Sequence, residues 1–273
     1  MTLLLRSDLY KLKKSLSFRV CLIISFVLGI IMSVLYYYAW QQLNQNIEET
    51  TKMIASLGDY GQTVQAALEL MPKNDLWSYV NISLSDLNVL YISAVVVSIF
   101  VGSEYSMGTL RNPLTRGHSR TKIYLSKLIV TTLASLAVIG LYTAGGTVSG
   151  CIMFGFSSSV SAGDILLTLL CYLLLFLAVV SFYVMVAVLT KKTGYAIAFS
   201  MIVPMLISSL ASVIKIGYAD FDKISRLWLF DTVISTQKLV QSSEAYIPMI
   251  AAAVYFALFT ALGMLMLRKQ EVK

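Results

Sequence analysis

Long apolar stretches alternate along the chain with shorter polar segments. Six of these stretches contain no Asp, Glu, Lys or Arg over 17 residues or more, and a helix needs about 20 mostly apolar residues to cross a bilayer. The longest stretch has 36 residues, too few for two crossings and a turn, and its apolar character fades at Ser157. The pattern therefore predicts six membrane-spanning helices, within the stretches 20–47, 87–103, 128–163, 165–190, 193–214 and 245–267.

The segments outside these stretches also carry helical patterns. Residues 2–16 place leucines at helical spacing with charges on the other faces, which predicts a helix in the inner membrane interface, or else a plain cytoplasmic tail. Two long outer segments show half-buried helical patterns, typical of amphipathic helices on the outer surface; the second could instead dip into the outer leaflet. The predicted order is an interfacial helix 1–16, span 17–40, outer segment 41–83, span 84–102, inner loop 103–127, spans 128–153, 164–190 and 193–214, outer segment 215–247 and span 248–267.

Composition and charge support this organisation. Hydrophobic residues make up 58% of the chain and charged residues 13%, against roughly 45–50% and about 25% in an average soluble domain, which excludes a water-soluble globular enzyme. Cationic loops stay cytoplasmic, and with both termini inside, 15 of the 21 Lys and Arg residues lie on the inner side. Topology thus explains the net charge of +7, and no nucleic-acid partner is needed to account for it.

No motif for catalysis or metal binding is visible. Asp86, Glu104 and Asp164 all lie at the ends of predicted spans, which argues against a transporter driven by an acid buried at mid-membrane. The sequence contains no phosphate-binding loop, nucleophile elbow or zinc-binding histidine pair, and its cysteines lie in apolar runs. We therefore expect a chain that is not an enzyme by itself and binds no cofactor or metal.

Two features inside the spans concern helix packing. Gly146 and Gly150 form a G-x-x-x-G pattern, which allows two helices to approach closely, either within the chain or across a dimer. Pro204 lies in the middle of the fifth span and is expected to kink that helix, because its ring removes one backbone hydrogen bond. The kink is either architectural or a hinge.

The inner loop carries the most informative motif. Glu104, Gly108 and Thr109 form an E-x-x-x-G-T sequence at the end of the second span, and a basic region with Arg116, Arg120 and Lys127 follows. This loop resembles the first cytoplasmic loop of ABC-2 type transporter permeases of the bacitracin-resistance and lantibiotic-immunity kind. A positively charged loop that only sets topology is the alternative interpretation.

The resemblance implies an all-α, six-span fold like that of the type V ABC exporters. The loop would form a coupling helix in a groove of a separate nucleotide-binding ATPase subunit, which would bind ATP and Mg. Within the loop, Leu110 and Leu114 would present an apolar knob, and Glu104 would pair with Arg111 or a partner residue. The coupling residues implied are Glu104, Gly108, Thr109, Leu110, Arg111, Asn112, Leu114 and Arg116.

The expected function follows from this resemblance. The chain would be the permease subunit of an exporter, paired with itself or with a second permease in a bacterial plasma membrane. Apolar spans rich in Met and aromatic residues favour an amphipathic or hydrophobic substrate such as an antimicrobial peptide or an antibiotic. The alternative is a membrane sensor or assembly subunit that binds a ligand through its outer segments and has no ATPase partner.

Overall fold

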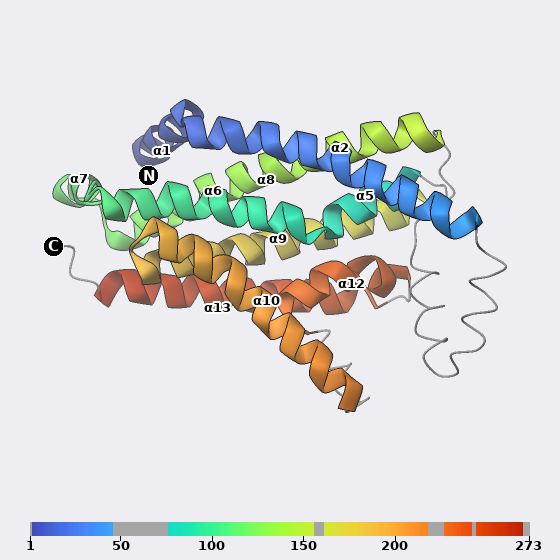
Figure 1. Cartoon of the computed structure of the whole chain (residues 1–273). Coiled ribbons are helices and arrows are strands. Elements are labelled where there is room, and N and C mark those ends of the chain that lie inside the picture. The colour runs from blue at the N-terminus through green and yellow to red at the C-terminus, as the bar shows by residue number, and fades with distance from the viewer. Residues whose placement is uncertain (1, 46–75, 156–160, 218–226, 242–243, 270–273) are drawn as a thin grey trace.

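The computed structural model of the chain describes residues 2–45, 76–155, 161–217, 227–241 and 244–269. These residues form a bundle of helices and include no strand (Figure 1). The helices are α1 (Thr2–Lys14), α2 (Leu16–Gln45), α5 (Leu76–Ser85), α6 (Leu87–Ser106), α7 (Arg111–Thr115), α8 (Arg120–Phe154), α9 (Ala162–Thr190), α10 (Thr193–Gly217), α12 (Leu229–Gln241) and α13 (Tyr246–Lys269).

Six of these helices are long and apolar enough to cross a bilayer, which confirms the predicted number of spans: α2, α6, α8, α9, α10 and α13. The 36-residue apolar stretch lies in the single helix α8 up to Phe154, as expected. The inner loop is shorter than predicted, because α6 continues to Ser106 and α8 begins at Arg120. The Ser119 hydroxyl accepts a hydrogen bond from the Lys122 amide and caps α8, so charged residues assigned to the loop belong to the first turns of a helix.

Helix α9 lies at the centre of the bundle and packs against α6, α8, α10, α12 and α13. The ring of Phe182 lies 5.8 Å from that of Phe230 on α12 and 5.2 Å from that of Phe259 on α13. The hydroxyl of the fully buried Tyr183 donates to the carbonyl of Leu90 on α6 at 3.1 Å. Because lipid is as apolar as these side chains, close packing and interhelical hydrogen bonds hold such a core together.

Glycines bring α8 against α2 and α5. A Cβ atom at Gly145 would lie 2.5 Å from the carbonyl oxygen of Phe26 on α2, and one at Gly146 would lie 2.3 Å from Ser83 Oγ on α5. Gly150 faces α5 in the same way. The G-x-x-x-G pattern therefore serves packing within the chain, where a larger side chain would collide with Ser83 or Tyr79 of α5.

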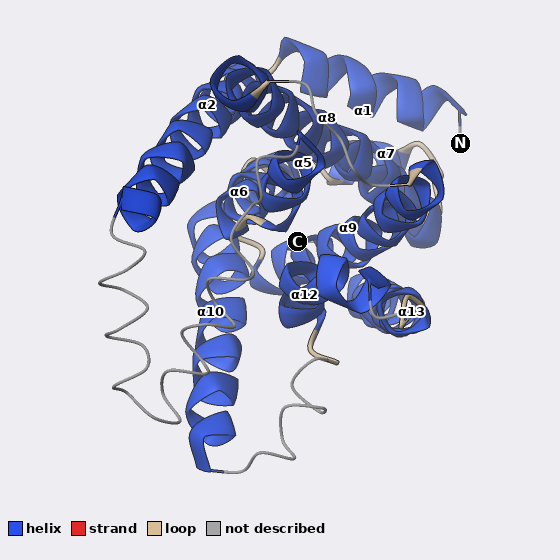
Figure 2. Ribbon diagram, turned by 90° about the vertical axis from the view of Figure 1, so that its right-hand side faces the viewer, coloured by secondary structure: helices blue, strands red, loops and turns tan. Residues whose placement is uncertain are grey.

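Helix α10 departs from the bundle over its second half. It contains the buried Pro204, and toward its C-terminal end the helix runs away from the other helices (Figures 1 and 2). A hydrogen bond of 2.7 Å from Ser208 Oγ to Asp231 Oδ1 on α12 still connects the two helices. Both a kink at Pro204 and a hinge function stay predictions.

The two long segments predicted to be outer contribute two short helices that pack on the bundle. Helix α5 buries Trp77 and Tyr79, and α12 buries Leu229, Phe230 and Val233. Helix α12 packs against α9 and α13, so this part of the segment 215–247 lies against the bundle. The helical pattern predicted between residues 54 and 71 lies outside the described residues.

One end of the bundle holds the elements on which function is expected to depend. Helix α1, the short helix α7 and the end of α13 all lie there (Figure 1). We call this the α7 end.

Candidate functional site

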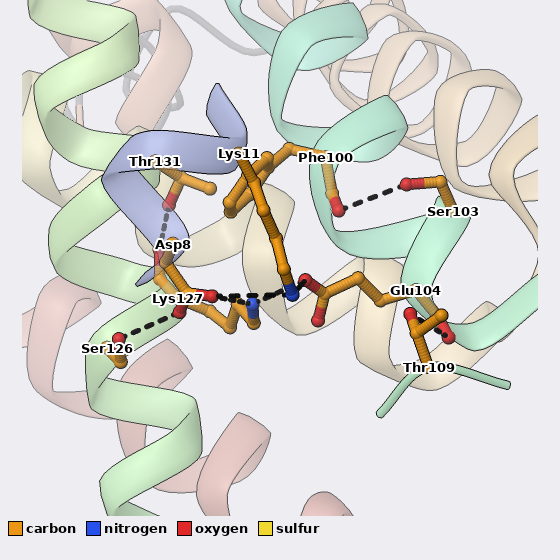
Figure 3. A network of polar contacts seen from close by, with 9 residues as sticks. All are labelled: Asp8, Lys11, Phe100, Ser103, Glu104, Thr109, Ser126, Lys127 and Thr131. Carbon is orange, nitrogen blue, oxygen red and sulfur yellow. Dashed lines mark hydrogen bonds and ion pairs between the residues drawn. The ribbon is translucent and has the colours of Figure 1, made fainter. Parts of the chain in front are cut away.

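Four ionisable side chains from three helices meet at the α7 end (Figure 3). The Nζ atom of Lys127 on α8 lies 2.7 Å from Asp8 Oδ1 on α1 and 2.7 Å from Glu104 Oε1 on α6. The Nζ atom of Lys11 on α1 lies 3.1 Å from Glu104 Oε1 and 4.0 Å from Asp8 Oδ1. We call these residues, Asp8, Lys11, Glu104 and Lys127, the inner ion network.

The inner ion network is largely removed from solvent. The side chains of Asp8, Lys127 and Glu104 are 2%, 5% and 7% exposed, whereas that of Lys11 is half exposed. Two carboxylates and two ammonium groups cancel in charge. Because desolvation of a charge is offset only when its partners are in place, removal of one member leaves an uncompensated buried charge.

The local sequence explains why each charge points inward. On α1, Asp8 lies between the buried Leu4 and Leu12 at four-residue spacing, so it shares their face. That face packs against α8, where Lys127 is flanked on the helix surface by the buried Ile123 and Tyr124. Asp8 in the apolar face of α1 thus meets Lys127 in the apolar face of α8. The third buried charge, Glu104, comes from the last turn of α6.

Neutral groups complete the surroundings of the network. Ser126 Oγ donates to Asp8 Oδ2 at 2.8 Å, and the Lys127 ammonium lies 5.0 Å from the centre of the Phe100 ring. Thr131 Oγ1 donates to the Lys127 carbonyl at 2.7 Å, within α8. The contacts of Ser126 and Phe100 restrict the rotamers of Asp8 and Lys127, which favours a single arrangement of the three helices.

The inner loop follows the network directly. Gly108 and Gly117 have φ angles of 65° and 79°, a backbone region that glycine enters without strain. They lie on either side of α7 and allow the chain to turn after α6 and before α8. Thr109 Oγ1 lies 3.5 Å from the Glu104 carbonyl. Each position of the E-x-x-x-G-T sequence therefore has a place in the structure. The Glu104 carboxylate belongs to the network, Gly108 forms the turn that follows, and Thr109 contacts the Glu104 backbone.

The exposed part of the loop differs from the predicted one. Leu110 is 3% exposed and belongs to the core, and Leu114 packs against that core. The prediction of Leu110 as an exposed knob is therefore wrong, because the turn at Gly108 directs the start of α7 back onto the bundle. Met107, at 68% exposed, and the exposed Asn112 and Arg116 form the free surface of the loop.

The basic residues of the motif also separate into different environments. Arg120 Nη1 donates to the carbonyls of Leu267 and Arg268 at 3.1 and 2.8 Å, so this side chain caps the C-terminal end of α13. Lys127 was expected in the loop and is instead a buried member of the network. Arg111 begins α7, and its side chain lies outside the described part of the structure.

Sequence reasoning did not identify the two α1 residues of the network. Asp8 is the only acidic residue among the first 47, and in the structure it lies between Leu4 and Leu12 on the buried face of α1. A lone acid on the apolar face of a basic helix is a usable signal, since burial there requires a cationic partner. The identity of that partner could not be read from the sequence.

A family model matches most of the chain, including part of this site. The family described as "Protein of unknown function (DUF2705)" matches residues 62–273. The chain belongs to the DUF2705 family. In this DUF2705 chain, the matched residues include Glu104, the inner loop and Lys127, whereas α1 with Asp8 and Lys11 precedes them. Neither the curated proteins nor the solved structures include a match to the chain.

A second polar cluster lies near the opposite end of α6 in this DUF2705 chain. Asp86 caps α6 by accepting a hydrogen bond from the Asn88 amide at 2.9 Å, and it also accepts one from the Tyr142 hydroxyl. A cavity of about 10 Å³ beside it is lined in part by Ser33 and Tyr36, which is room for about one water molecule. No group of three or more potential metal ligands occurs among the described residues.

Proposed function

We propose that this chain is the membrane-spanning permease subunit of an ATP-driven exporter of the ABC-2 type, with both termini in the bacterial cytoplasm. Six apolar helices, with α1 and the end of α13 at the same end of the bundle, support this topology. The excess of Lys and Arg in the segments at that end supports its assignment to the cytoplasmic side.

The inner ion network is the observation that carries the proposal. It joins α1, α6 and α8 immediately before and after the loop with the E-x-x-x-G-T sequence. A loop that transmits motion has to be fixed firmly to the helices that it moves, and a buried charge network provides such a fixed point. A loop that only orients the chain by its charge needs no buried anchor.

The partner in this proposal is a separate ATPase subunit that binds ATP and Mg. It would contact the free surface of the loop at Met107, Asn112 and Arg116, which project from the bundle. Closure of two ATPase subunits would move the loops of two permease chains, identical or paralogous, and the network would pass that motion to α6 and α8.

The exported substrate is proposed to be amphipathic or hydrophobic, such as an antimicrobial peptide or an antibiotic. The exposed faces of the spans are apolar, and that of α10 includes Phe199, Met205 and Leu210. A substrate that partitions into the membrane could reach such faces from the bilayer.

Co-purification tests this proposal. The full chain, extracted mildly from its native membrane, is expected to retain a soluble subunit that carries a phosphate-binding loop, identified by mass spectrometry. A Met107→Asp, Arg116→Glu variant should lose that subunit. A Lys122→Glu variant, altered at an exposed position just beyond the loop, should keep it. The proposal fails when no ATPase is retained by the native chain or when both variants retain it equally.

The alternative function is a membrane sensor or assembly subunit. The packing of α5 and α12 on the bundle favours it, because these helices connect the outer segments to α8 and α9. This function requires no ATPase, so the same purification distinguishes the two.

A further inference from the structure

Helix α1 has two different faces. One face packs against α8 through the buried Leu4, Asp8 and Leu12. The opposite face carries Arg6, Tyr10 and Lys13, all exposed, with Tyr10 at 62%. The leucine stripe expected to face the membrane is therefore directed in part toward the protein, and a cationic, aromatic face remains.

The charge on this outward face has one sign. Asp8 is the only acid of α1, and its carboxylate pairs with Lys127 in the inner ion network. Arg6, Lys13 and Lys14 lie on the surface with no acid of the same helix among them. The Lys14 ammonium lies 5.6 Å from the centre of the Tyr10 ring, so cation and aromatic ring form one continuous surface.

The position of α1 determines what this face meets. Figure 2 shows α1 on the rim of the bundle, beside α8, with its outer side turned away from the other helices. The spanning helix α2 begins at Leu16, two residues after α1 ends. A helix on the rim, at the level where a span begins, lies at the depth of the lipid headgroups.

We propose that the outward face of α1, formed by Leu3, Arg6, Tyr10, Lys13 and Lys14, binds the headgroups of anionic phospholipids. The cations contact the phosphates, while Leu3 and Tyr10 reach the boundary of the acyl chains. Exposed apolar side chains between the cations favour a lipid surface over an acidic protein. The α8-facing side is unavailable for this contact because the ion network holds it. The inference does not depend on the exporter function.

A lipid titration of the purified full chain, followed by native mass spectrometry, tests this inference. Phosphatidylglycerol is compared with phosphatidylcholine. The Arg6→Ser, Lys13→Ser, Lys14→Ser variant should lose preference for phosphatidylglycerol by about fivefold for each cation removed. A matched variant, Lys122→Ser, Lys192→Ser, Lys269→Ser, removes three exposed cations elsewhere and should stay within about twofold of the native chain.

A second measurement leaves the charges of α1 unchanged. Tyr10→Cys is introduced after Cys21, Cys151 and Cys171 are replaced by Ser, and its labelling by a soluble maleimide is followed in nanodiscs. Phosphatidylglycerol should slow labelling severalfold relative to phosphatidylcholine alone.

Three results would overturn the inference. The first is an equal loss of lipid preference in both triple variants, which indicates a general basic surface. The second is an unchanged preference in the α1 variant. The third is protection of Tyr10→Cys only in native membranes, which indicates a protein at this face. Unfolding temperatures of both triple variants verify that they are folded.

Discussion

Replacement of Lys127 by Met is the sharpest test of the inner ion network. Lys127 Nζ contacts Asp8 Oδ1 and Glu104 Oε1, both at 2.7 Å. Met fills a similar volume without the charge, so the variant leaves two buried carboxylates that, among the described side chains, only the half-exposed Lys11 contacts as a cation.

The magnitude follows from these distances. At 2.7 Å, one ion pair contributes about 6 kcal/mol at an effective dielectric constant of about 20. Desolvation of each buried ion opposes this attraction by several kcal/mol. Loss of one partner from a buried pair lowers the free energy of unfolding by about 3–5 kcal/mol. Lys11 already lies near both carboxylates, so we expect the lower value, about 3 kcal/mol.

The assay is thermal unfolding of the purified chain in detergent. A loss of about 3 kcal/mol should lower the unfolding temperature by about 6–12 °C. The exposed Lys122 on the same helix provides the control, and Lys122→Met should change stability by under about 0.5 kcal/mol. The double variant Asp8→Asn, Lys127→Met restores charge balance and should be destabilised by much less than the sum of its single changes.

Two results would refute this reasoning. A Lys127→Met variant as stable as the Lys122→Met control would show that the network behaves as a surface salt bridge, for which about 0–1 kcal/mol is expected. Strict additivity in the double variant would show that Asp8 and Lys127 do not interact.

Three further predictions concern helix packing, the polar cluster at Asp86 and Tyr142, and Pro204. Gly145→Leu should prevent α2 from approaching α8 and abolish a monodisperse fold on size-exclusion chromatography, whereas Gly140→Ala, which meets nothing within 4 Å, should be tolerated. Tyr142→Phe removes a hydrogen bond to the Asp86 carboxylate and should cost about 1.5–3 kcal/mol in unfolding free energy; an unchanged stability would contradict this. Pro204→Ala restores one backbone hydrogen bond and should add about 1 kcal/mol. If the variant is more stable but transports less, Pro204 acts as a hinge. If transport is unchanged, the proline has an architectural role.

Local pattern alone predicts much of the fold. A span is recognised because bilayer thickness requires about 20 apolar residues in one run, and the six runs correspond to six helices. The site of close helix packing at Gly146 can also be recognised locally, because a residue without a side chain lets a second helix approach. The boundaries of the inner loop were less accurate, because Arg120 and Lys122 continue a helix beyond its apolar part.

The site required the tertiary arrangement. Asp8 and Lys127 are separated by 119 positions in the sequence and Lys11 and Glu104 by 93, so no local pattern specifies that they meet. The burial of Leu110 has the same origin, because the direction of α7 depends on the surface of the bundle against which it packs. Charge in the sequence predicts which side of the membrane a segment occupies, since the membrane acts on each segment separately. Which charges pair depends on how helices distant in the chain pack together, and only their contact decides that Asp8, Glu104 and Lys127 share one buried site.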